Sequence, residues 1–302
     1  MFDAPDSGRP TPPAATEPAP APPHGRGRRV DVGGRRLHVA CAGPADARPP
    51  VLLEAGGFGV GADWAVVQAR LSDRRRTLAY DRAGLGLSDP GPEPRDAAAV
   101  VDDLQALLAA VNLRGPYILA AHSSAATYVQ LFALRRPEAV CGLVLVDAIP
   151  AEAMADRKVT ERLKGAERFA GLAPLAARFG LLRAADGLAG DPIGLPEAAA
   201  AERRAAFASE RHNHWAAAEA RAQLRDGERV RAAGELSREL PVAVVTSVGD
   251  AVLREHMEAP ARRSRRGWAE HVEGANAATL LGRHADAVVR AVDHVARLGR
   301  GR

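Results

Sequence analysis

The feature that most limits how this chain can fold is the stretch 117–129, in which an apolar run beginning at Tyr117 ends in a short polar segment and a helical run follows at once. A strand that feeds straight into a helix forces a sharp turn, and the residue at its apex projects from the carboxyl edge of the sheet. Ser123 lies at that apex, within Ala121-His122-Ser123-Ser124-Ala125. The pattern predicts either a nucleophilic serine or an ordinary strand–helix junction with two incidental serines.

Small residues two positions away on either side are part of this pattern, which usually reads Gly-x-Ser-x-Gly. The chain carries alanine at both places, Ala121 and Ala125. If either position required a positive φ, alanine there would cost about 1–2 kcal/mol. An alanine with ordinary φ would add only one methyl group to the packing of the turn.

Composition limits the partners that we expect. The 302 residues, 47% of them hydrophobic, are enough for one large α/β domain with an inserted element. The 41 basic and 37 acidic residues nearly balance and only 4% are aromatic, so we expect no nucleic-acid partner. No apolar stretch approaches the roughly 20 residues of a membrane span, so we expect no membrane partner either.

The cysteines and the N-terminal sequence bear on the compartment. Cys41 and Cys141 each lie in an apolar run, so we interpret them as small core residues, with no disulfide, metal site or cofactor. The N-terminal segment has no apolar signal core. These observations predict a cytoplasmic protein.

The order of the segments predicts the fold. Residues 1–28 are rich in proline and alanine and should form a disordered tail. Alternating apolar residues around Gly33-Gly34 predict an N-terminal β-hairpin, and strands then alternate with helices up to residue 148. Residues 149–239 contain helical segments without a convincing strand, and strands and helices resume over 240–302. We therefore predict a doubly wound, mostly parallel sheet (29–148 and 240–302) with a helical cap (149–239).

Four segments in fixed order make the chain resemble the α/β-hydrolase superfamily over most of its length from Val30 to Leu298. They are Leu52-Leu53-Glu54-Ala55-Gly56-Gly57, Tyr80-Asp81-Arg82-Ala83-Gly84-Leu85-Gly86-Leu87-Ser88-Asp89-Pro90, the turn at Ser123, and Leu143-Val144-Leu145-Val146-Asp147-Ala148. The resemblance implies hydrolysis of a small ester or amide, as the small-molecule substrate, by a serine, a histidine and an acid. A serine at the apex differs from the aspartate of the epoxide hydrolase and haloalkane dehalogenase branches.

The resemblance also assigns roles to individual residues. Ser123 is the expected nucleophile, and the backbone N–H of Ser124 with that of Gly57 or Phe58 is the expected oxyanion hole. Asp250, after a late strand, is the favoured acid. Asp147 is the alternative acid, and its other interpretation is a helix cap or structural anchor.

The expected base is missing. Similar family members have histidine where this chain has Ala277, in Asn276-Ala277 before Leu280-Leu281. Loss of a triad member typically lowers kcat by about 10⁴–10⁶. We interpret the remaining candidates, His122, His212, His214, His271 and His284, as core or surface residues rather than bases.

Two alternatives to an active serine hydrolase stay open. The chain could be a catalytically inactive relative that binds a small apolar ligand or a partner. It could also be a dinucleotide-binding protein, because Gly57-Phe58-Gly59-Val60-Gly61-Ala62 follows a strand and Asp81 ends the next one.

Overall fold

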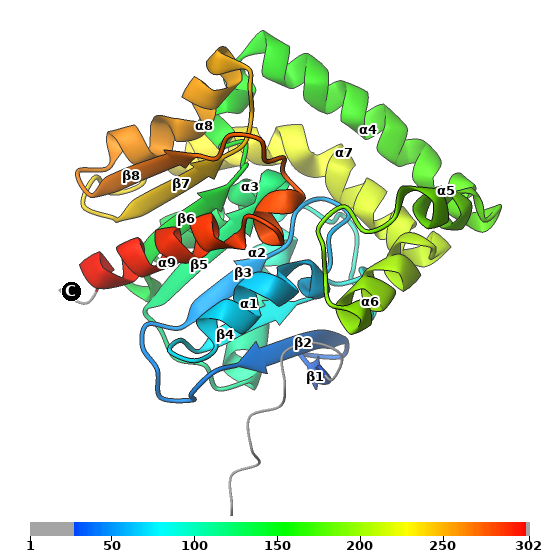
Figure 1. Ribbon diagram of the computed structural model, residues 1–302, viewed down its shortest axis with the longest axis horizontal. Coiled ribbons are helices and arrows are strands. Elements are labelled where there is room, and N and C mark those ends of the chain that lie inside the picture. The colour runs from blue at the N-terminus through cyan, green and yellow to red at the C-terminus, as the bar shows by residue number, and fades with distance from the viewer. Residues whose placement is uncertain (1–26, 300–302) are drawn as a thin grey trace, which may run out of the picture.

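Residues 27–299 of the protein are described by a computed structural model, in which the side chains of residues 186–189 are left out. Figure 1 shows a central twisted sheet between two layers of helices. The sheet has eight strands in the order β1-β2-β4-β3-β5-β6-β7-β8. They are β1 (Arg28–Asp31), β2 (Arg36–Ala42), β3 (Val51–Glu54), β4 (Thr77–Tyr80), β5 (Tyr117–His122), β6 (Val140–Val146), β7 (Val242–Thr246) and β8 (Gly267–His271).

The first two strands form the predicted hairpin. β1 pairs with β2 and β2 pairs with β4 in antiparallel register, and every later pairing is parallel. The hairpin turn needs left-handed backbone at Gly33 and Gly34, which glycine adopts without a steric penalty. The predicted mostly parallel sheet with an N-terminal hairpin is therefore confirmed.

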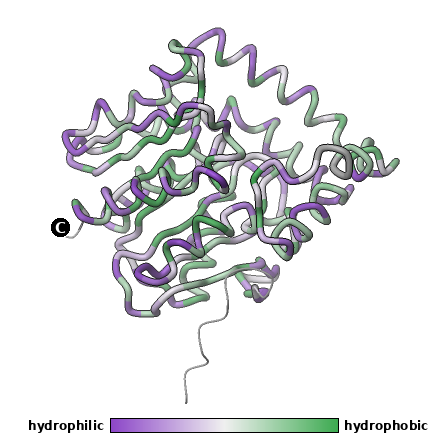
Figure 2. Tube along the Cα trace, viewed as in Figure 1, coloured by the Kyte–Doolittle hydropathy of each residue, from purple (hydrophilic) through white to green (hydrophobic). Residues whose placement is uncertain are grey.

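Side-chain alternation along the strands builds two cores. In β5, Leu119 and Ala121 pack on one face of the sheet, whereas Ile118 and Ala120 pack on the other. The first face is covered by α2 (Ala97–Ala110) and α3 (Ala126–Arg135), and the second by α1 (Ala65–Leu71) and α9 (Ala285–Gly299). Both faces of a central strand are thus buried, which is why these strands are continuous apolar runs, as Figure 2 shows.

Helices fill the chain between β6 and β7. They are α4 (Arg157–Arg178), α5 (Leu181–Ala189), α6 (Glu197–Phe207) and α7 (Glu210–Ala233), and α8 (Ala251–Arg263) follows β7. Figure 1 shows α4 and α7 running over the end of the sheet. The domain boundaries that we placed at residues 149 and 239 stay predictions. Almost all of the expected tail, residues 1–26, lies outside the described residues.

Five short 3₁₀ turns complete the described structure: η1 (Gly61–Trp64), η2 (Ser123–Ala125), η3 (Pro137–Ala139), η4 (Ala151–Ala155) and η5 (Thr279–Leu281). Two of them, η1 and η2, follow β3 and β5 at the carboxyl edge of the sheet. From residue 27 to residue 299, no helix has the length and apolar character needed to cross a membrane.

Candidate functional site

The turn after β5 has the backbone that a nucleophile elbow requires. β5 ends at His122, η2 begins at Ser123, and α3 begins three residues later at Ala126. Ser123 has a φ of 54°, which is uncommon for a residue with a side chain and marks the apex of the turn. Ala125 has a φ of −67°, and Ala121 lies in the strand. The strain therefore falls on Ser123 alone, and the two alanines adopt ordinary backbone.

The loop after β3 packs against this elbow. A methyl group added to Gly56 would lie 3.1 Å from Ser123 Cβ, and one added to Gly57 would lie 3.1 Å from Ser124 Oγ. The next residue, Phe58, also has a positive φ, of 61°. The structure thus brings Gly57, Phe58, Ser123 and Ser124 together, although their predicted roles rest on the resemblance.

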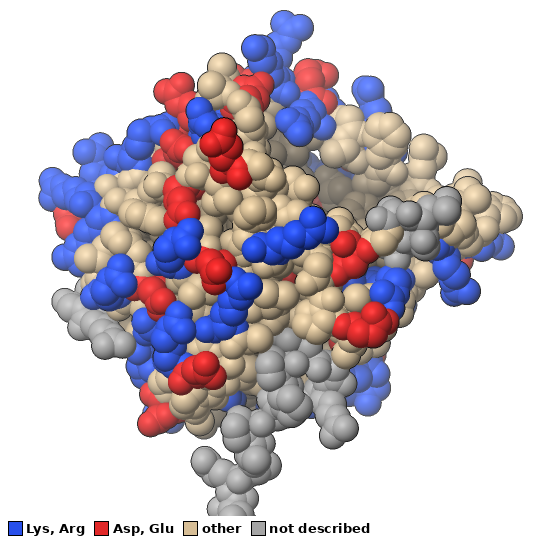
Figure 3. Space-filling model, viewed as in Figure 1, with Lys and Arg blue, Asp and Glu red and all other residues tan. Residues whose placement is uncertain are grey.

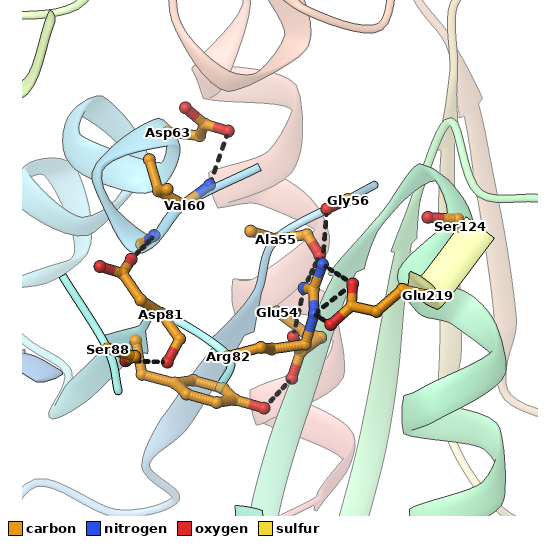
Figure 4. Close-up of polar contacts among 12 residues, drawn as sticks. Glu54, Ala55, Gly56, Val60, Asp63, Asp81, Arg82, Ser88, Ser124 and Glu219 are labelled. Carbon is orange, nitrogen blue, oxygen red and sulfur yellow. Dashed lines mark hydrogen bonds and ion pairs between the residues drawn. The ribbon is translucent and has the colours of Figure 1, made fainter. Parts of the chain in front are cut away.

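A buried arginine holds the Gly56 loop in place, as Figure 4 shows. The Arg82 guanidinium donates to the carbonyl oxygen of Gly56 at 2.9 Å and to the Glu54 carboxylate at 2.9 Å. Glu219 of α7 accepts three further bonds from it, two from Nε at 3.0 Å and 3.1 Å and one from Nη2 at 2.8 Å. Burial alone would lower the pKa of Arg82, but Glu219 and Glu54 outweigh it and raise the pKa well above the usual range. A fixed positive charge therefore ties the loop to α7.

Two more residues of α7 contact the same region. His212 Nε2 donates to the carbonyl oxygen of Phe58 at 3.0 Å, and its Nδ1 accepts from the backbone N–H of Gly86 at 3.0 Å. Gln223 donates to the carbonyl oxygen of Ser124 at 3.2 Å. Since residues 212, 219 and 223 are spaced by seven and four, they lie on one face of the helix. This face of α7 fixes the elbow and the loop relative to each other.

The sequence did not indicate these roles of Arg82, Glu219 and His212. We interpreted His212 as core or surface, and it is indeed fully buried. Burial lowers its pKa to about 4, so the ring is neutral at physiological pH. Both ring nitrogens are used in holding backbone groups, so neither is free to act as a base. The one signal in the sequence for a buried ion pair was the presence of two charged residues, Glu54 and Arg82, at the ends of apolar runs.

The two candidate acids differ in position. Asp147 is buried, has a φ of 42°, and lines the same cavity as Ser123 and Ala277. Its carboxylate accepts from the backbone N–H of Ser247 at 2.7 Å and from the Ser247 hydroxyl. Asp250 is exposed and caps α8, where the backbone N–H of Leu253 lowers its pKa foremost. Asp250 is not among the residues that line the cavity.

Ala277 lies where the resemblance implies a histidine. Its carbonyl oxygen is 3.1 Å from His122 Nε2, and because a carbonyl only accepts, His122 Nε2 carries the hydrogen. Burial lowers the pKa of His122. None of the described residues that line the cavity is a histidine. His271 ends the edge strand β8, His284 directly precedes α9, and His214 is exposed on α7.

The cavity between the elbow and helices α4 and α7 has a volume of about 340 Å³. Figure 3 shows a hollow below α4 on the face in view. Alanines, other aliphatic side chains and Met257 supply half of the lining residues, and the charged ones are Asp147, Arg162, Glu167 and Glu219. The lining residues are Gly57, Phe58, Ser123, Ser124, Tyr128, Asp147, Ile149, Arg162, Leu163, Ala166, Glu167, Ala170, Ala216, Glu219, Ala220, Gln223, Val248, Leu253, Met257 and Ala277.

The structure gives Asp81 a structural role and argues against the dinucleotide alternative. Asp81 is fully buried, and its two oxygens accept from the backbone N–H groups of Gly61 at 2.7 Å and Leu87 at 2.9 Å. A ribose could not reach this carboxylate. Among the described residues, His38, Asp81 and Glu202 are a group with the spacing of metal ligands. His38 Nδ1, however, already lies 3.2 Å from Asp81.

Comparisons with known proteins agree with this geometry. A family model described as "alpha/beta hydrolase fold" matches residues 49–190. A probable transporter, efuK, of Hormonema carpetanum is 34% identical over 130 residues, which are 41% of this chain and 19% of that protein. The 2-(acetamidomethylene)succinate hydrolase of Mesorhizobium japonicum is 34% identical over 123 residues, 41% of this chain and 43% of the enzyme. The chain thus spans less than half of the length of these curated relatives.

A solved structure extends the likeness over nearly the whole chain. The haloalkane dehalogenase DbeA of Bradyrhizobium elkani superposes with a TM-score of 0.73 at 19% identity, covering 91% of this chain and 99% of the enzyme. At that identity the likeness concerns the fold alone. Together, the sheet order, the elbow and the family match over residues 49–190 show that the chain has the α/β-hydrolase fold.

Proposed function

We propose that the protein is a hydrolase in which Ser123 attacks the carbonyl of a small ester or amide, with slow turnover. The observation that carries the proposal is the strained elbow: Ser123, with a φ of 54°, lines a cavity that Phe58 and Asp147 also line, two of the three other described non-glycine residues with positive φ. Backbone strain of this kind concentrates at functional sites. The mostly apolar wall favours a substrate with a short acyl chain.

The chemistry follows from the residues present. The Ser123 oxygen would bond to the carbonyl carbon, and the bond from that carbon to the leaving oxygen of an ester or nitrogen of an amide would break. The leaving group would take a proton from water and depart as an alcohol or amine, and a second water would later hydrolyse the acyl-serine to release the acid. Gly57 or Phe58 and Ser124 would donate backbone hydrogen bonds to the developing oxyanion. With Ala277 in place of a histidine, the serine proton must pass to water. We therefore expect turnover roughly 10⁴-fold or more below that of a complete triad.

Hydrolysis of p-nitrophenyl butyrate tests this proposal. The unmodified protein should release p-nitrophenol slowly and carry a butyryl group on Ser123 by mass spectrometry, and Ser123→Ala should do neither. Ala277→His should raise the rate, because it supplies a base beside Ser123. Ala277→Gln is the matched control, since it adds a side chain of similar size without a basic nitrogen. A rate unchanged by Ser123→Ala, with no adduct, would refute the nucleophile assignment.

The absence of histidine from the described lining favours a second candidate, an inactive relative that binds a small apolar ligand in the same cavity. This candidate predicts no turnover and no adduct, but saturable binding of butyrate esters by isothermal calorimetry. Ala166→Phe, which would fill the cavity from α4, should abolish that binding. Binding that survives this substitution would place the ligand elsewhere.

A further inference from the structure

Helices α4 and α5 carry a cluster of exposed apolar side chains, which we call the α4–α5 patch. It consists of Phe169, Leu172, Leu175, Phe179 and Leu181, with 79%, 63%, 56%, 70% and 61% of their surfaces exposed. Elsewhere among the described residues, the large apolar side chains exposed to this extent are Leu87 and Val252. Single exposed apolar residues need no explanation, but five close together on neighbouring helices mark an interaction surface.

The patch and the cavity occupy opposite faces of α4. Phe169, Leu172, Leu175 and Phe179 are spaced by three, three and four residues, which places them on one side of the helical path. Leu163, Ala166 and Ala170, which line the cavity, lie about half a turn away. α4 therefore shields the cavity with one face and presents the apolar patch to solvent with the other.

The residues around the patch are basic. Between residues 157 and 183 the chain has seven lysines and arginines but only two glutamates. Arg168, Arg178 and Arg183 are exposed, and no ion pair joins them to any side chain that the structure describes. Figure 3 shows uncharged surface near the junction of α4 with α5 and, along the rest of α4, blue side chains with fewer red ones among them. An amphipathic helix with an apolar stripe and basic neighbours is typical of binding to a lipid surface.

We propose that the α4–α5 patch docks on an anionic lipid surface. The charge distinguishes this partner from a second copy of the chain. In a symmetric dimer the patch would face itself, and the basic side chains of the two copies would repel one another. An anionic bilayer attracts the same side chains while the patch enters its interfacial region.

This inference revises the sequence-based expectation of no membrane partner, which considered only segments long enough to span a bilayer. Docking does not depend on catalysis. If the proposed hydrolase function also holds, docking would bring the helix that walls the Ser123 cavity against lipid. Amphiphilic esters with an acyl chain would then be the substrate class.

Vesicle sedimentation with the full chain tests the docking. Vesicles of phosphatidylcholine alone should bind little protein, whereas vesicles of equal parts phosphatidylcholine and phosphatidylglycerol should bind it, less so at high salt. The double variant Phe169→Ser/Phe179→Ser should lower the partition coefficient about 10-fold or more. Leu87→Ser is the matched control, because Leu87 is exposed but lies outside the patch. Circular dichroism and thermal melting should show that each variant is folded.

A second pair of variants separates charge from apolar contact. Arg168→Gln/Arg178→Gln should weaken binding to the anionic vesicles, whereas Arg114→Gln, an exposed arginine in the loop before β5, should not. Equal binding to both vesicle types, or binding unaffected by the serine variants, would overturn the proposal. So would a concentration-dependent dimer, seen by light scattering and lost in Phe169→Ser/Phe179→Ser, without vesicle binding. Each readout is independent of ester hydrolysis, so loss of the proposed function would leave the docking result interpretable.

Discussion

Protonation of His212 should couple the stability of the protein to pH. The ring is fully buried between the carbonyl oxygen of Phe58 and the backbone N–H of Gly86, an arrangement that only the neutral ring can satisfy. Its pKa is about 4 in the folded chain, below the ordinary value of 6.5. Between these values the unfolded chain binds a proton that the folded chain does not. The free energy of unfolding should therefore fall as the pH is lowered through this range.

The size of the effect follows from the two pKa values. Going from pH 7 to pH 5, linkage predicts that His212 alone removes about 2 kcal/mol from the free energy of unfolding. Urea denaturation at both pH values measures it, because urea is uncharged and does not screen electrostatic interactions. The variant His212→Gln is expected to be less stable at pH 7. It should also lose about 2 kcal/mol less than the unmodified protein on acidification.

Other groups titrate in the same range, so the comparison between variants carries the test. His214→Gln is the matched control, since His214 is exposed on the same helix and its removal opens no buried site. This control should keep the loss of about 2 kcal/mol on acidification that His212 contributes. If His212→Gln does so too, His212 is not held neutral by the Phe58 and Gly86 contacts, and the reasoning fails.

Three further predictions follow from the same structure. Glu219→Gln should lower the free energy of unfolding, measured in urea, by about 3 kcal/mol, because it leaves the buried Arg82 with Glu54 as its remaining carboxylate. The control Glu161→Gln, at an exposed position, should change the free energy of unfolding little, and equal effects of the two substitutions would refute the role of the buried ion pair. Gly84→Ala should lower the free energy of unfolding by about 1–3 kcal/mol more than Gly34→Ala. Both glycines have a φ of 87°, but only at Gly84 would the new methyl group lie 2.2 Å from Trp215. Equal melting temperatures of the two variants would exclude the clash. In an Ala277→His variant that hydrolyses p-nitrophenyl butyrate faster than the unmodified protein, adding Asp147→Asn should abolish that increase in rate, whereas adding Asp250→Asn should not. The reason is that Asp147, unlike Asp250, lines the cavity. The reverse result would restore Asp250 as the acid.

The predicted strands agree closely with the structure where both faces of a strand are buried. The apolar run at β5 begins at the residue where the structure has it, because a strand covered on both faces is apolar along its length. The elbow could also be predicted from the sequence, because no room remains for a loop between β5 and α3. Whether Ala121 and Ala125 could replace glycine was not visible, because φ depends on how the turn is packed, and the structure places the strain on Ser123 alone.

The contacts of α7 could not be predicted from the sequence. His212, Glu219 and Gln223 reach residues more than 90 positions away, and no local pattern records which backbone group each will meet. The exposure of the apolar residues of α4 could not be predicted from the sequence either. Helical spacing predicts that they share one face, but whether that face meets the core or solvent depends on which side of α4 packs against α7.

The order of apolar runs, turns and charged residues in the sequence was enough to predict the mostly parallel sheet, its N-terminal hairpin and the serine at the apex of the elbow. These features depend on local backbone preference and on the alternation of buried side chains, both of which are properties of neighbouring residues. Only the tertiary structure decided that Asp147 rather than Asp250 shares the cavity with Ser123, that α7 holds the loop after β3, and that the α4–α5 patch is exposed. Those features depend on which distant segments meet, and that is set by the packing of the whole chain rather than by any stretch of it.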